Sequence, residues 1–135
     1  MFKTILFPVD SSKDSREAAE VVAEMVKTCK SRLILLSVVE IDQLEGKRET
    51  KMKSAGEVAL LLKKAQSFFK EQGIETELLE KQGIPSFVIC DVADEVSANL
   101  IIMGCRGLGL TSEGFAESVT HRVVNLAPCP ILVVP

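Results

Sequence analysis

The chain has 135 residues, of which 47% are hydrophobic, and its formal net charge is −3. This length and hydrophobic content suffice for one core, and they predict a single domain over residues 1–135. A nucleic-acid partner is not expected, because the chain has no basic excess to neutralise phosphates and neither Trp nor Tyr to stack on bases.

The first half of the chain predicts two strands, each followed by a helix. The apolar run 4–9 predicts a strand, and hydrophobic residues recur at helical spacing over 18–26, after a Ser-x-x-Asp pattern at 11–14 that can cap a helix. The nearly unbroken apolar run 32–39 is typical of a strand covered on both faces.

A charged segment over 40–50 predicts a loop, and it leads into a helix over roughly 51–72. Gly73 is well placed to stop that helix. The following strand, 74–81, is more polar than the one before, as expected near a sheet edge.

The last part of the chain continues the alternation. Pro85 suits the first turn of a helix, and apolar residues at helical spacing over 88–96 predict its buried face. A strand over 100–103, a short helix over 118–125 and a final strand over 130–134 complete the pattern. With right-handed crossovers, this order predicts an α/β fold: a five-stranded parallel sheet with helices on both faces, a Rossmann-like three-layer sandwich.

Ligands of such sheets bind beyond the carboxyl ends of the strands, near the point where the strand order reverses. Three stretches meet that condition, namely 8–11, 37–39, and 103–110 running on to 117–120. Gly104, Gly107 and Gly109 allow close backbone approach, and the amides that begin the last helix favour an anion. Turn glycines without a ligand are the alternative, which composition alone favours, and neither GxxxxGK[ST] nor GxGxxG is present.

Four stretches resemble the universal stress protein family: Ile5–Asp10, Gly83–Pro85, Leu100–Gly107 and Ser118–Val134. The match covers essentially the whole chain. The resemblance implies an adenine nucleotide alpha hydrolase-like fold, a cytoplasmic role in stress response, and homodimers made through the last strand, Ile131–Val134. The apolar edge of that strand would otherwise be left unpaired, although a plain edge strand shielded by the terminal proline is the alternative.

Members of this family that bind ATP carry Gly-x-x-Gly, nine residues, and then Gly-Ser or Gly-Thr. Gly104 and Gly107 match the first pair and Ser118 matches the hydroxyl residue, but Glu117 stands where the last glycine belongs. By the same resemblance, an adenine nucleotide, AMP or ATP, is the expected ligand, with Mg²⁺ only if a polyphosphate is bound. The residues predicted to bind it are Pro8, Val9, Asp10, Ser11, Val38, Met103, Gly104, Arg106, Gly107, Gly109, Glu117, Ser118, Val119 and Thr120.

Within this set, the resemblance assigns the adenine and ribose end to Asp10, Val38 and Met103, and the phosphate end to residues 118–120. Arg106 can neutralise a phosphate, pair with Glu117, or remain solvated.

Glu117 is the departure that matters most for affinity. A carboxylate beside a phosphate costs up to about 4 kcal/mol at a separation near 4 Å and an effective dielectric near 20. The same carboxylate is favoured at a helix start, so it can occupy the anion position itself. We therefore predict weakened ATP binding, with a less charged adenine nucleotide or an empty site.

No catalytic residue is predicted. Asp10 and Glu117 are the evident general bases and both are explained without catalysis, while a structural role is preferred for His121.

The four cysteines form no CxxC motif, and the amino terminus lacks the pattern of a signal peptide or membrane span, which favours a reduced, cytoplasmic protein. A signalling module that binds nucleotide and acts on an unidentified protein is the preferred interpretation; a slow ATPase and an interaction protein without nucleotide are the alternatives.

Overall fold

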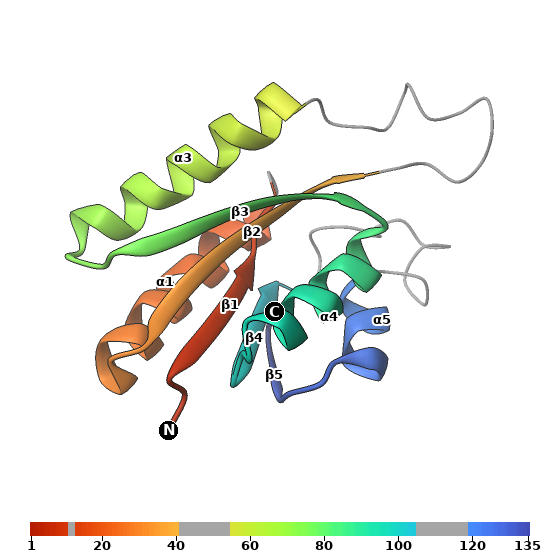
Figure 1. The fold of residues 1–135 in the computed structure, drawn as a ribbon. Helices are drawn as coiled ribbons and strands as arrows, with labels where there is room; N and C mark the ends of the chain where they lie inside the picture. The colour runs from red at the N-terminus through yellow and green to blue at the C-terminus, as the bar shows by residue number, and fades with distance from the viewer. Residues whose placement is uncertain (11–12, 41–54, 105–118) are drawn as a thin grey trace.

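The computed structural model describes residues 1–10, 13–40, 55–104 and 119–135 (Figure 1). In these ranges strands and helices alternate along the chain. The elements are β1 (Thr4–Pro8), α1 (Lys13–Cys29), β2 (Arg32–Glu40), α3 (Ala55–Glu71), β3 (Thr76–Gly83), α4 (Pro85–Glu95), β4 (Leu100–Gly104), α5 (Val119–Leu126) and β5 (Ile131–Val134). None of the helices in the described ranges is long and apolar enough to cross a membrane.

The strands form one sheet in the order β3-β2-β1-β4-β5, and every neighbouring pair is parallel. The central strand is β1, where Ile5 pairs with Leu33 of β2 on one side and with Leu100 of β4 on the other. The chain first builds outward through β2 and β3 and then crosses to β4. The strand order therefore reverses between β1 and β4, which is where such sheets bind ligands.

Helices cover both faces of the sheet, as predicted (Figure 1). Ile5, Phe7 and Val9 of the first strand segment pack in one apolar cluster with α1 and α3. Leu6, between them in sequence, packs in a second cluster with α4 and α5. Alternation along β1 thus divides the core into two layers, because successive side chains of a strand point to opposite faces.

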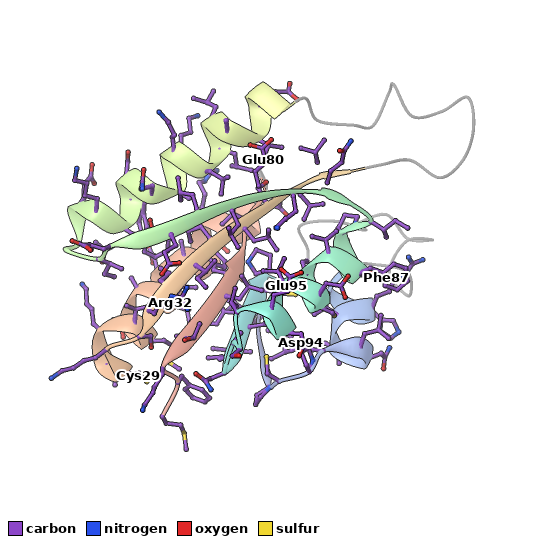
Figure 2. All side chains as sticks on the ribbon, viewed as in Figure 1. Cys29, Arg32, Glu80, Phe87, Asp94 and Glu95 are labelled. Atoms are coloured by element: carbon purple, nitrogen blue, oxygen red, sulfur yellow. The ribbon has the colours of Figure 1, made fainter. Side chains whose placement is uncertain are left out.

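The two edges of the sheet differ in polarity. On β3, Glu77, Glu80 (labelled in Figure 2) and Lys81 are exposed, which confirms the prediction of a polar strand near an edge. On β5 the four residues are Ile-Leu-Val-Val, and Val133 is 37% exposed. One edge is therefore charged and the other apolar.

Three helices end on a residue with positive φ, a conformation that closes the last turn. Gly73 (φ 80°) follows α3, as predicted, and the amide of Ile74 then donates to the carbonyl of Phe69 at 2.9 Å. Lys30 and Ser97, each with φ 55°, end α1 and α4 in the same way. A residue with a Cβ is strained in this conformation, so neither Lys30 nor Ser97 is predictable as a helix end from its residue type.

Small shifts from the predicted bounds have local causes. β3 begins at Thr76 and not at residue 74, because the Ile74 amide is used in closing α3. β1 ends at Pro8, although the amide of Val9 still donates to the Leu36 carbonyl of β2 at 2.8 Å. The predicted loop and helix start over 41–54 lie outside the described residues.

Candidate functional site

The carboxyl ends of β1, β2 and β4 lie at the same edge of the sheet. Parallel register sets Pro8 beside Leu36 and Gly104 beside Val134, so the residues that follow these strands meet at this edge. Of the predicted site residues, the structure describes Pro8, Val9, Asp10, Val38, Met103, Gly104, Val119 and Thr120. Ser11, Arg106, Gly107, Gly109, Glu117 and Ser118 lie outside the described residues.

At the end of β1, two backbone amides fix the path of the chain. The amide of Val9 bonds to β2, as above, and the amide of Asp10 donates to the Ser15 hydroxyl in α1 at 3.3 Å. Asp10 is half-buried, and Val9 is 8% exposed. The strand end is thereby tied to the helix that follows it, and the Asp10 carboxylate stands at the strand's carboxyl end.

At the end of β4, a side chain of α5 forms a hydrogen bond with the backbone of the strand. The Thr120 hydroxyl donates to the carbonyl oxygen of Gly104 at 2.8 Å. Because its one proton is used in this bond, the hydroxyl can only accept hydrogen bonds from a further group. Thr120 therefore positions the start of α5 against the strand end, where the resemblance had assigned it to phosphate binding.

The described site residues divide between the two faces of the sheet. Val38, Met103 and Val119 all pack against the cluster beneath α4 and α5, and Met103 is only 6% exposed. Val9 belongs to the opposite cluster, beneath α1 and α3. The candidate site thus lies at the rim of the sheet, where the two core clusters both reach the ends of the strands.

Sequence reasoning missed one contact at this edge. Ser15 was not singled out, although it bonds to the Asp10 amide. Ser15 could have been found from its position, because it is a hydroxyl residue near the start of the helix that follows Asp10. Side chains of this kind at such positions commonly accept hydrogen bonds from nearby backbone amides.

Thiol chemistry is disfavoured at two cysteines, Cys90 and Cys129. Burial raises the pKa of Cys90, with smaller contributions from Asp91 and Cys129, and burial also raises the pKa of Cys129. A raised pKa leaves little thiolate at neutral pH, and the thiolate is the reactive form. Both side chains pack on the cluster beneath α4 and α5, where they act as small apolar groups.

A parallel sheet of this strand order, with its reversal between β1 and β4, defines a doubly wound α/β protein. The family model described as universal stress protein matches residues 1–135. The chain belongs to the universal stress protein family.

Individual relatives agree with this assignment. The chain is 60% identical over 136 residues to universal stress protein Sll1654 of Synechocystis, covering all of this chain and 87% of the relative. Among solved structures, UspA from Lactobacillus plantarum superimposes with a TM-score of 0.83 at 23% identity, covering 99% of this chain and 98% of that one. This second likeness shows that the fold is shared.

Two further structural neighbours are described as nucleotide complexes. One is a universal stress protein in complex with cAMP, with a TM-score of 0.79 and 22% identity, covering 99% of this chain and 97% of that one. The other, from Archaeoglobus fulgidus, is in complex with dAMP, with a TM-score of 0.72 and 24% identity, covering 99% of this chain and 98% of that one.

Proposed function

We propose that the protein is a cytoplasmic, homodimeric universal stress protein that binds an adenine nucleotide where β1 and β4 end. Occupancy of that site would report the state of the cell to a protein partner. The observation that carries the proposal is the meeting of Asp10, Val38, Met103 and the start of α5 at one edge of the sheet. Neighbours of the same fold that bind cAMP and dAMP support it.

The nucleotide we favour carries fewer phosphates than ATP. Glu117 replaces the glycine of the family's ATP motif, and a carboxylate there repels a phosphate chain. AMP extends one phosphate toward that position, whereas ATP extends three. Binding is therefore proposed for AMP, with Mg²⁺ needed only by a polyphosphate.

The test compares the affinities of AMP and ATP for the wild type and for Glu117→Gly by calorimetry. We expect ATP to bind at least tenfold more tightly to the variant, which is about 1.4 kcal/mol, while AMP changes little. Glu113→Gly removes a nearby acid from the nine-residue spacer, where the motif specifies no residue, and serves as the matched control. Unchanged ATP affinity in Glu117→Gly would contradict the role of Glu117, and no binding of either nucleotide would contradict the proposed ligand.

The two alternative functions are separated by what copurifies with the protein. A binding module retains its nucleotide unchanged, a slow ATPase releases ADP from added ATP, and an interaction protein retains nothing. Mass spectrometry of the denatured supernatant distinguishes the first from the third. Incubation with ATP and Mg²⁺ reveals the second, and sustained ADP release would overturn the proposal of a binding module.

The homodimer is proposed through β5. Its apolar residues form one edge of the sheet, and Val124 and Leu126 of the neighbouring α5 are 52% and 50% exposed. Pairing two copies of this edge around a two-fold axis would satisfy the backbone groups of both strands and cover apolar surface.

A further inference from the structure

The outer side of α4 gathers its exposed residues in one stripe. These residues are Phe87, Asp91, Asp94 and Glu95. At about 3.6 residues per turn they fall within about 100° of the helix circumference. The opposite side of the helix faces the core and carries the buried residues Ser86, Ile89, Val92 and Ala93. We call the exposed stripe the acidic face of α4; Phe87, Asp94 and Glu95 are labelled in Figure 2.

The negative charge of this face is not balanced within the described parts of the chain. α4 contains no Lys or Arg, whereas α1 and α3 each carry both acidic and basic residues. Among the described residues, none of the three acidic side chains of α4 forms an ion pair or a hydrogen bond. The face therefore presents three unpaired carboxylates along one helix.

The positions of these acids are unfavourable for α4 itself. Asp94 and Glu95 lie in its last turn, where the helix dipole favours cations, and no basic residue is present there. Asp91 lies three residues before Asp94 and four before Glu95, and like charges at these spacings repel each other on a helix. Local rules that a fold breaks without compensation are typical of functional surfaces. A cationic group from outside the chain would relieve both penalties.

The arrangement of the face indicates what kind of cation it suits. Asp91 and Glu95 are separated by about 6 Å along the helix axis, and the whole stripe from Phe87 to Glu95 extends over about 12 Å. Charges spread in this way suit several cations carried on one chain better than a single ion. Phe87 is 51% exposed at the amino end of the stripe. Guanidinium groups both pair with carboxylates and stack on aromatic rings, so arginine matches the two parts of the face.

We propose that the acidic face of α4 docks an arginine-bearing segment of a partner protein, with guanidinium groups on the carboxylates and on the ring of Phe87. α4 packs against β2 and β3, whereas β5 forms the opposite edge of the sheet, so this face stays open if two chains pair through β5. The docking surface rests on the proposed function only for the existence of a protein partner. Because its test needs no nucleotide, its failure is distinguishable from a failure of nucleotide binding.

Fluorescence anisotropy of a labelled peptide tests the docking surface. The probe is an alanine-based helical peptide of about sixteen residues with arginine at every fourth position, titrated with the full chain at low ionic strength. We expect saturable binding at one site per chain, which weakens as salt is added. The lysine version of the peptide should bind about threefold more weakly, because lysine stacks less well on Phe87. Absence of saturable binding of the arginine peptide would overturn the proposal.

Charge variants then place the peptide on α4. One variant neutralises the three acids of the face: Asp91→Asn, Asp94→Asn and Glu95→Gln. It should weaken binding about tenfold, and it should be at least as stable in urea as wild type because repulsion within α4 is relieved. The matched control neutralises three exposed acids of α1 and should bind like wild type: Glu17→Gln, Glu20→Gln and Glu24→Gln. Equal weakening in the two variants would show attraction to the net charge alone and would refute the surface.

Phe87→Leu separates the contribution of the ring from that of the charges. The variant keeps an apolar side chain of similar reach but removes the aromatic ring. We expect the arginine peptide to lose its preference over the lysine peptide, while binding of both stays sensitive to salt. An unchanged preference for arginine in Phe87→Leu would contradict the contact with this ring.

Discussion

The hydroxyl of Thr120 and the carbonyl of Gly104 are joined by a 2.8 Å hydrogen bond that spans sixteen positions of the chain. It connects the first turn of α5 to the last residue of β4. The ends of the intervening segment, which carries most of the family's ATP motif, are thus held together by one side chain.

Replacing Thr120 by Val should weaken both the fold and the site. The variant keeps the shape of the side chain but leaves the Gly104 carbonyl without this donor, and a lost hydrogen bond of this kind costs about 1 kcal/mol. We expect that loss in urea unfolding, together with a severalfold weaker affinity for AMP. Thr120→Ser retains the hydroxyl and should behave like wild type; equal stability of the Val and Ser variants would show that the bond contributes nothing.

Glycine at position 30 should stabilise the protein. Lys30 has a φ of 55°, which is strained for a residue with a Cβ and unstrained for glycine. Lys30→Gly is expected to raise the free energy of unfolding by about 0.5–1 kcal/mol, measured in urea. Lys30→Ala removes the same side chain but keeps the Cβ, so it should bring no gain. A destabilised glycine variant would contradict the prediction.

Ser86→Ala should also stabilise the protein. Ser86 is 1% exposed in the first turn of α4, and its hydroxyl has no hydrogen-bond partner within the described parts of the chain. A buried, unsatisfied hydroxyl costs about 1–3 kcal/mol, so its removal should add about 1 kcal/mol to the free energy of unfolding. Ser67→Ala on the exposed side of α3 is the control and should change little. A loss of stability in Ser86→Ala would show that the hydroxyl has a partner, for which an ordered water is the natural candidate.

The ion pair between Arg32 and Glu77 should make a small, pH-dependent contribution. The hydrogen bond from Arg32 lowers the pKa of Glu77 below its ordinary value of 4.5, and both side chains are about half exposed. A carboxyl whose pKa is lowered by folding contributes stability above the ordinary value, and that stability is lost as the pH falls through the lowered one. The stability difference between wild type and Glu77→Gln should therefore be small at neutral pH and vanish in acid. A difference that persists well below pH 4.5 would contradict this origin.

Val133→Lys should convert the proposed dimer into a monomer. Val133 is partly exposed on β5, and a lysine there would place a charge in the paired edge. Sedimentation equilibrium should show a dimer for wild type and a monomer for the variant. Leu60→Lys adds the same charge at an exposed apolar position on α3 and should remain dimeric. A monomeric wild type, or a dimeric Val133→Lys, would rule out this interface.

Much of the fold was predictable because the spacing of apolar residues and the positions of Gly and Pro indicate the same helices and strands. The apolar run at 32–39 indicated a strand covered on both faces, and β2 is buried over most of its length. Gly73 and Pro85 marked the end of one helix and the start of another, and both predictions are confirmed. These signals are local, so a single sequence carries them.

The features that could not be predicted depend on contacts between distant residues. The bond from Thr120 to Gly104 requires that α5 return to the end of β4, which no spacing along the chain encodes. The hollow of about 400 Å³ between α1 and α3 likewise depends on Ala19 and Ala65, which resemble any other helix-favouring alanines until the helices are packed. At the proposed nucleotide site, the role predicted for Glu117 stays a prediction, since it rests on the family pattern alone.

The contrast between the two sheet edges limits how many copies can assemble. If β5 pairs with its own copy around a two-fold axis, the sheet continues across the junction and both apolar edges are consumed. Among the strands that the structure describes, the edges left are then two copies of β3, where Glu77, Glu80 and Lys81 are exposed. Charge on an edge strand discourages further pairing. Growth by strand addition would then stop at two chains, which gives a closed assembly in place of a fibre.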